Sequence, residues 1–187
     1  MNINHKHHME DKMKTHIVFL TPFLIFICTN AHAEFYVEAD PIAYGLNGHS
    51  LHLGVQGGGF RMQVGMFKAE VPDAFKDNKN YNVIQEGHGI KIDYYGKNPD
   101  GTFIGLEYGQ TTAKYQLKTG GQVVEQDVNL LGFRLGYKIK FSKHLFITPW
   151  VGVDKNISKI TDITIGSETY SPDEWIIFPT VHLGIEF

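Results

Sequence analysis

Cysteine, long apolar runs and helix-like patterning are all scarce in this sequence of 187 residues. Cys28 is the only cysteine, so no intramolecular disulfide can form, and a disulfide-stapled scaffold is excluded. The longest apolar run covers residues 16–28, well short of the roughly 20 residues that a membrane-spanning helix needs. Beyond residue 33 no apolar stripe of period 3.6 extends over about ten residues, so an α-helical domain is not expected.

The apolar run near the N-terminus has the features of a secretory signal peptide. Lys14 precedes it, and Ala31-His32-Ala33 follows it with small residues at the −3 and −1 positions of a cleavage site. We therefore predict a signal peptide at residues 1–33, with Met13 as an alternative start, and an exported domain at residues 34–187.

The exported part is acidic and of ordinary size for one domain. Removing 33 of the 187 residues leaves 154. Three of the 17 Lys and Arg and two of the 20 Asp and Glu leave with the signal peptide, so the net charge becomes about −4. This balance argues against nucleic acid as a partner.

Short segments of apolar–polar alternation separated by turn signals fill the exported part, which predicts an all-β fold. Tight turns at 57–59, 97–101 and 142–144 alternate with longer links at 46–49, 71–82, 117–121 and 156–173. This alternation is typical of transmembrane up-and-down barrels. The eight expected strands are 34–45, 50–57, 59–70, 83–96, 102–116, 122–140, 145–155 and 174–187.

Each expected strand has one large apolar face and one small or charged face, and period two does not say which face is inside. Recurrent glycine on the polar face favours an inverted barrel, in which the polar face points into the lumen and the apolar face points outward. A narrow lumen needs small residues on its wall. Aromatic residues near strand ends favour the same arrangement. These aromatic residues are Phe35, Tyr36, Tyr108, Tyr137, Phe141, Trp175 and Phe187.

The C-terminus adds a motif. The chain ends on Phe187, and Ile185, Leu183 and Val181 alternate back from it, which resembles the C-terminal assembly signal of Gram-negative outer-membrane proteins. With the signal peptide and the strand count, the exported part resembles small eight-stranded outer-membrane barrels of the OmpA, OmpX and OmpW type. This resemblance implies a closed antiparallel up-and-down β-barrel in the bacterial outer membrane, with membrane lipid and the barrel assembly machinery as partners.

Ten charged side chains are expected on the inward face. An eight-stranded barrel is about wide enough for its own side chains, and an unpaired buried charge is very costly. We therefore expect a structural ladder of ion pairs that plugs the lumen; an ion or proton path is the alternative. The ten residues are Glu38, Asp40, Arg61, Lys91, Asp93, Glu107, Arg134, Lys138, Asp154 and Glu186.

His49, Ser50 and His52 admit two chemical alternatives, a metal site at the two histidines and a lipid hydrolase at the serine. The alternation places His49 at the rim and His52 in the lumen, so the two need not converge. No HExxH, CxxC or GxSxG pattern occurs after residue 33. We therefore predict no catalytic residue, no metal ligand and no cofactor.

Three prolines fall inside the first, seventh and eighth expected strands, which are neighbours in a closed barrel. Pro41, Pro149 and Pro179 each remove a ladder hydrogen bond, and a closed barrel has no edge strand to hide them on. They predict either bulges and strand ends or a weakened seam. Such a seam would admit a hydrophobic ligand sideways, as in OmpW-type barrels and the outer-membrane lipid A palmitoyltransferase. The exported part lacks a recognisable catalytic set for that palmitoyltransferase, so only the lateral opening carries over.

The expected function is that of a non-enzymatic outer-membrane barrel. It would give structural support, meet a host or surface partner through loops 71–82 and 156–173, or pass a small hydrophobic ligand in a porin-like manner. A barrel enzyme that modifies lipid A or phospholipid is one alternative, and a secreted soluble lipocalin-like barrel is another.

Overall fold

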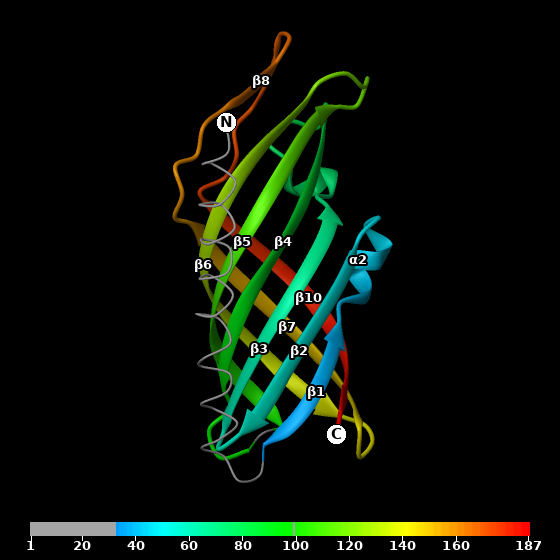
Figure 1. Cartoon of the computed structure of the whole chain (residues 1–187), viewed down its shortest axis with the longest axis vertical. Coiled ribbons are helices and arrows are strands. Elements are labelled where there is room, and N and C mark those ends of the chain that lie inside the picture. The colour runs from blue at the N-terminus through cyan, green and yellow to red at the C-terminus, as the bar shows by residue number, and fades with distance from the viewer. Residues whose placement is uncertain (1–32, 99) are drawn as a thin grey trace, which may run out of the picture. The chain divides into compact units, whose positions relative to one another are not determined.

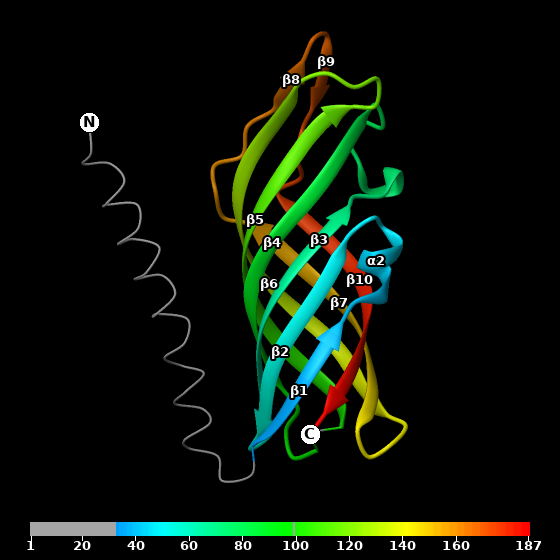
Figure 2. The same cartoon turned by 45° about the vertical axis from the view of Figure 1, so that its right-hand side comes forward.

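Residues Glu34–Phe187 form a closed antiparallel β-barrel of eight strands in a computed structural model that describes residues 33–98 and 100–187 (Figure 1). The neighbour order around the barrel is β1-β10-β7-β6-β5-β4-β3-β2 (Figure 2), which confirms the predicted up-and-down topology. The signal peptide, Met13 and Cys28 lie outside the described residues.

Besides the eight wall strands, the barrel has a short helix, a 3-10 turn and a small hairpin. The hairpin lies in the last long loop. The helix is α2 (Pro41–Gly45), the turn is η1 (Asp73–Phe75), and the hairpin consists of β8 (Ile163–Ile165) and β9 (Glu168–Tyr170). Among the described residues, no helix is long and apolar enough to cross a membrane. The wall strands are β1 (Glu34–Ala39), β2 (His49–Gly57), β3 (Phe60–Glu70), β4 (Tyr81–Tyr94), β5 (Gly101–Leu117), β6 (Val123–Lys140), β7 (Leu145–Asn156) and β10 (Trp175–Glu186).

The first strand is much shorter than predicted. The expectation of a strand through residue 45 is wrong, because β1 ends at Ala39 and the chain turns into α2. The Asp40 carboxylate accepts the N–H of Ile42 at 2.8 Å, and Pro41 occupies the first turn. An aspartate cap followed by proline is a strong helix start, since proline has no N–H to lose there.

The large apolar side chains of the wall point outward. Phe133 on β6 is 70% exposed, whereas Arg61 on β3 is 0% exposed inside the barrel. The outward row Val64–Ile90–Tyr108–Leu131 runs across β3 to β6 in register, and further apolar rows lie below it. These outward apolar rows, from Val64–Ile90–Tyr108–Leu131 downward, are called the apolar belt. The predicted inverted facing is confirmed over this belt.

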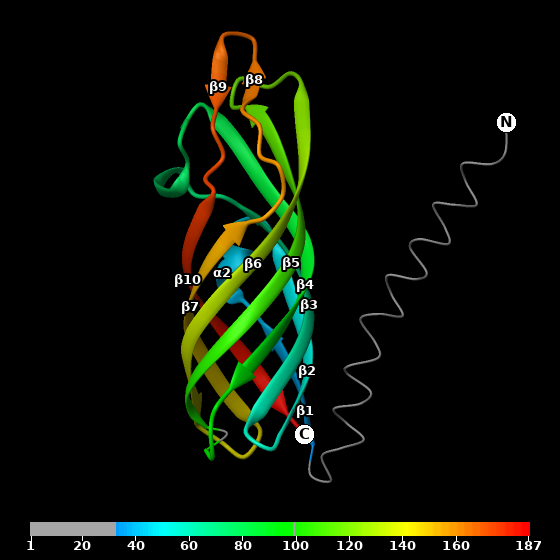
Figure 3. The ribbon, with the colours of Figure 1, turned by 90° about the vertical axis from the view of Figure 1, so that its left-hand side faces the viewer.

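Above that row the polarity of β4, β5 and β6 reverses. The next outward row carries His88, Gln110 and Asn129, and the row after it carries Glu86, Thr112 and Asp127. The inward positions become apolar and pack against the β8–β9 hairpin, which stands at the same end of the barrel (Figure 3). The three strands thus continue beyond the belt as a sheet with a conventional apolar core, which the sequence reading missed. This core contains Tyr81, Val83, Ala113, Tyr115, Ile163, Ile165 and Tyr170.

The two longest loops form one folded structure. The hydroxyl of Tyr81 donates to the Glu168 carbonyl at 2.7 Å, and the Asn78 amide donates to the Glu168 carboxylate at 2.9 Å. The hydrogen bonds from Asn78 and Asn80 lower the pKa of Glu168. The segment after β9 is also attached, because the Ser171 N–H donates to Asp77 at 3.2 Å.

Candidate functional site

The lumen of the barrel is filled by tiers of ion pairs, and the lowest tier lies near the chain's C-terminus. Lys138 Nζ is 2.6 Å from Glu186 Oε2 and donates to Gln56 Oε1 at 3.1 Å. Lys140 pairs with the same Glu186 carboxylate. A carboxylate shared by two ammonium groups closes this end of the lumen with hydrogen-bonded side chains.

The second tier surrounds Glu38 on β1. Its carboxylate is ion-paired with Arg61 from β3, and it lies 3.2 Å from Thr148 Oγ1 and 3.2 Å from His182 Nδ1. The Arg61 guanidinium also stacks over the Tyr36 ring, 3.7 Å from its centroid. Four strands are therefore connected through one buried carboxylate.

The third tier joins β4 to β6. Arg134 Nε is 3.2 Å from Asp93 Oδ1, and the Arg134 guanidinium lies 4.0 Å from the centroid of the Trp150 ring. Gly105 provides the space for this pair, because a Cβ at this position would overlap the Asp93 carboxylate. This close approach explains why glycine recurs on the inward face.

A looser group of charges lies above the third tier. Lys91 Nζ is 3.9 Å from Glu107 Oε2, and Asp154 fills the space that Gly132 leaves open. Asp40 stands apart from the tiers, as the cap of α2. The other nine predicted charges all lie on the inner side of the barrel.

Aromatic side chains inside the lumen were missed by the sequence reading. The prediction that Tyr36 belongs to an interfacial girdle is wrong, because its side chain is buried in the lumen under Arg61. Trp150 and Phe146 also point inward and lie beside cations. The strand alternation could have predicted this position, since Tyr36 has the same parity as the inward-facing Glu38.

The residues considered for metal or hydrolase chemistry do not form such a site. His49 is exposed on the outside, whereas His52 is buried and stacks on His182 with ring centroids 4.8 Å apart. Ser50 Oγ accepts the Asp40 N–H at 3.3 Å and makes no hydrogen bond with a histidine in the described part of the chain. Over residues 33–98 and 100–187, no three His, Cys, Asp or Glu side chains come together as metal ligands would.

A gap in the strand pairing follows from the short β1. The β1–β10 ladder runs only from Tyr36↔Glu186 to Ala39↔Leu183, so the outer part of β10 has no β1 partner. The helix α2 contacts β2, β3 and β10 there (Figure 2). The Thr180 hydroxyl on β10 donates to the Asp40 carboxylate at 2.6 Å, which fastens the helix to the far side of the gap.

The three prolines lie in three different settings. Pro41 is in α2. Pro179 has the same parity as Phe187, whose N–H donates toward β1, so it lies on the unpaired edge of β10, where no donor is needed. Pro149 faces β6, and the β6–β7 ladder skips from Gly136↔Trp150 to Ile139↔Ile147 at this position.

The fold is similar to that of solved outer-membrane barrels. No family model matches the sequence, and no curated protein matches it. A major outer membrane protein from Thermus thermophilus superposes with a TM-score of 0.51 at 13% identity, covering 83% of this chain and 100% of that chain. This likeness confirms the predicted architectural resemblance and concerns the fold alone.

Two further solved structures match over similar lengths. Neisserial surface protein A (NspA) gives a TM-score of 0.46 at 11% identity, covering 82% of this chain and 94% of that chain. The N-terminal β-barrel domain of Pseudomonas aeruginosa OprF gives 0.46 at 12% identity, covering 83% of this chain and 96% of that chain.

Proposed function

We propose that residues 34–187 form a non-conducting outer-membrane barrel that holds a folded surface structure outside the membrane. The carrying observation is the inverted polarity, with large apolar side chains exposed around the wall and ion pairs buried inside it. A soluble monomer rarely exposes a continuous apolar surface larger than a few hundred Å². In a bilayer the same belt would lie against lipid chains, which is favourable.

The height of the belt supports a bilayer position. On β6 the outward apolar positions run from Leu131 to Ile139, close to the roughly 9–11 residues that a tilted transmembrane strand needs. Lys155 and Trp175 lie opposite each other at the upper rim, with Lys155 Nζ 5.4 Å from the Trp175 ring centroid. Such cation and indole side chains suit the interface between lipid and water.

The lumen tiers support a closed barrel. Conduction needs a continuous polar path wide enough for hydrated ions, and eight strands leave room for little more than side chains. Arg61, Arg134 and Lys138 stand at successive levels, each paired with a carboxylate and each fully or almost fully buried. Charges held in this way act as a plug.

Fractionation and conductance test this proposal. The full chain expressed in a Gram-negative host should stay in the sarkosyl-insoluble fraction and migrate faster on gels before boiling than after it. In planar bilayers it should give no steady conductance. Recovery of the protein as a soluble species would refute the membrane assignment, and stable channels would refute the plug.

Sideways passage of a hydrophobic ligand is a second candidate function, favoured by the pairing gap between β1 and β10. The helix that fills this gap is held to β10 through Asp40 and Thr180, so a helical turn could move without breaking a strand ladder. Thr180→Val removes the donor while keeping the side-chain shape.

In proteoliposomes, Thr180→Val should take up an apolar fluorescent probe faster than the wild type does. Thr169→Val in the outer hairpin is the matched control and should leave uptake unchanged. Equal uptake by all three proteins would eliminate this candidate.

A further inference from the structure

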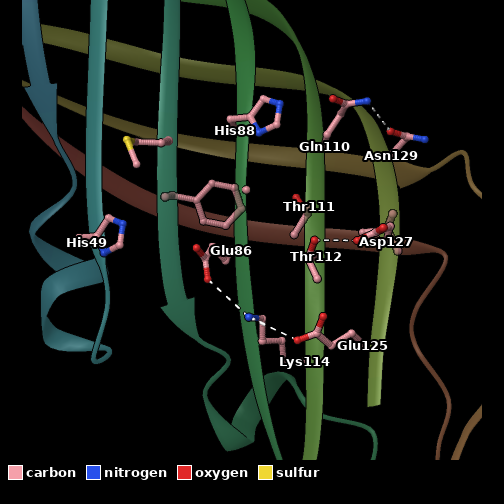
Figure 4. A pocket seen from close by; sticks show the side chains of 14 residues that line it. His49, Glu86, His88, Gln110, Thr111, Thr112, Lys114, Glu125, Asp127 and Asn129 are labelled. Atoms are coloured by element: carbon pink, nitrogen blue, oxygen red, sulfur yellow. Dashed lines mark hydrogen bonds and ion pairs between the residues drawn. The ribbon is translucent and has the colours of Figure 1, made fainter. Parts of the chain in front are cut away.

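The outer face of β4, β5 and β6 carries a hollow directly above the apolar belt. Its volume is about 800 Å³. Figure 4 shows the side chains that line it. Most of its lining side chains stand in outward rows, among them Glu86–Thr112–Asp127 and, one step nearer the belt, His88–Gln110–Asn129. The next row toward the belt is Ile90–Tyr108–Leu131. If the proposed membrane position holds, the hollow lies at the level of outer-leaflet headgroups and sugars.

Cross-strand hydrogen bonds orient the polar groups of the hollow. Asn129 Oδ1 accepts from the Tyr108 hydroxyl at 3.3 Å and from the Gln110 amide at 3.4 Å. Neither donor of the Asn129 amide group makes a hydrogen bond within the described part of the chain, so both stay available. Thr112 Oγ1 donates to Asp127 Oδ1 at 2.7 Å, and among residues 33–98 and 100–187 the second carboxylate oxygen has no donor, so it can accept from a ligand.

Hydrogen-bonding capacity remains unused elsewhere in the hollow. His88 is exposed and makes no hydrogen bond or ion pair within the described residues. Glu86 and Glu125 share Lys114 at 4.0 and 3.4 Å, so their carboxylates keep free lone pairs. Hydroxyl, amide, imidazole and carboxylate groups thus gather in one place, each with a donor or acceptor to offer.

The charge of the lining discriminates between ligand classes. Three carboxylates, from Glu86, Glu125 and Asp127, face one ammonium group, from Lys114. This excess of negative charge repels phosphate, sulfate and other carboxylates. A neutral ligand rich in hydroxyl groups fits instead, because each hydroxyl both donates and accepts. Met66 adds an apolar rim against which the C–H face of a sugar ring can pack.

We propose that this hollow binds a neutral saccharide. The sugar is presented either by a glycolipid of the same membrane leaflet or by a soluble glycan. The site goes beyond the proposed function, which assigns no ligand to the outer sheet, and only its glycolipid source depends on the membrane position.

An oligosaccharide array tests the chemistry. The purified full chain in detergent is applied to neutral hexose oligosaccharides and to sulfated and sialylated counterparts. The wild type should bind neutral members, and Asp127→Ala should weaken that binding about tenfold or more, since a charge-assisted acceptor is lost. Asp162→Ala, an exposed aspartate outside the hollow, is the matched control and should bind like the wild type.

Heat-modifiable gel mobility checks that each variant is folded, and Gln110→Ala replaces Asp127→Ala if the latter does not fold. Binding to anionic sugars alone, no binding to any neutral sugar, or equal binding by the wild type and the folded variant would overturn the proposal. Because the array uses detergent-solubilised protein, such a result leaves the membrane assignment untouched. A soluble protein that binds neutral sugars would refute only the membrane assignment.

Competition in proteoliposomes distinguishes a membrane glycolipid from a soluble glycan as the source of the saccharide. Vesicles of phospholipid alone are compared with vesicles that also contain lipopolysaccharide with a neutral core saccharide. If the glycolipid occupies the hollow, only the phospholipid vesicles should bind the oligosaccharide selected on the array. Equal binding to both vesicles assigns the site to soluble glycans.

Discussion

The Thr180 hydroxyl donates a 2.6 Å hydrogen bond to the Asp40 carboxylate, across the place where β1 no longer pairs with β10. The same carboxylate caps α2 through the Ile42 N–H. One side chain therefore ends the first strand, starts the helix and connects that helix to the last strand. This arrangement replaces the ladder bonds that a longer β1 would have made.

The prolines provide the first prediction. The residue opposite Pro149 in the β6–β7 register is Tyr137, whose carbonyl faces β7, where Pro149 has no N–H to donate. Pro149→Ala should supply that donor and stabilise the barrel by about 0.5–1.5 kcal/mol. Pro179→Ala, on the unpaired edge of β10, should change stability little. Urea unfolding in detergent measures both, and a larger gain from Pro179→Ala would contradict the assigned strand edges.

The second prediction concerns the belt. Leu135→Arg should cost roughly 2–4 kcal/mol in a membrane, because Leu135 lies midway along the outward apolar row of β6. Asn82→Arg is the control, since it lies on the outward parity of β4 above the belt and should be tolerated. Folding yield into vesicles measures the difference. Similar yields for both variants would mean that the apolar belt does not meet lipid.

The third prediction concerns the buried pair of Glu38 and Arg61. Glu38→Ala leaves the guanidinium without its partner and should destabilise the barrel by about 3–5 kcal/mol. The double variant Glu38→Gln with Arg61→Met should recover part of that loss, because no buried charge is left uncompensated. The temperature at which the fast gel band disappears reports both effects. A double variant that is less stable than the single one would contradict the prediction, because Arg61 would then stabilise the barrel without Glu38, through its contact with the Tyr36 ring.

The fourth prediction is a pH dependence outside the barrel wall. Hydrogen bonds from Lys118 and Lys76 lower the pKa of Asp73 to about 2. A carboxyl whose folded pKa is lowered stabilises the structure above its unfolded pKa, and that contribution is lost as pH falls through the folded pKa. Loop 71–80 should therefore keep its amide protection at pH 4 and lose it toward pH 2. Asp73→Asn should weaken this protection already at neutral pH, and an Asp73 titration midpoint near 4 would contradict the contact.

The fifth prediction concerns assembly. Deleting Phe187 should reduce the amount of barrel in the membrane, since the C-terminal aromatic residue resembles an assembly signal and its N–H donates to the Phe35 carbonyl at 2.9 Å. Phe141→Ala removes another exposed aromatic side chain from the turn region between β6 and β7. That control should assemble normally. If the two variants reached the membrane in equal amounts, Phe187 would not act as an assembly signal.

Local patterns in the sequence were enough to predict the strands and their facing. Alternation along β6 places Leu131 and Phe133 on one face and Arg134 on the other whatever the rest of the chain does, because side chains of a strand alternate. Turn residues then set the antiparallel order. The end of β1 was also readable locally, since Asp40-Pro41 is a helix-start signal, but the apolar Ile42 and Ala43 suggested a continuing strand.

The partners inside the lumen could not be read from the sequence. Glu38 meets Arg61 because of the stagger between strands, and His182 reaches the same carboxylate from a strand 144 residues later. The stagger is a property of the closed sheet, which no single strand contains. The hairpin β8–β9 was missed for a related reason, because three-residue strands carry too little alternation and are held by Tyr81 and its neighbours.

The sequence by itself therefore determined a β-barrel pattern of strands with one apolar and one polar face, since this follows from period two along each strand, and the recurrent glycines on the polar face indicated that the apolar face points outward. Tertiary structure alone decided where that outer face ends, which charges pair and how the hollow above the belt is assembled. Glu86, Thr112 and Asp127 become neighbours only when three strands take their register, and register is set by the closure of the whole sheet.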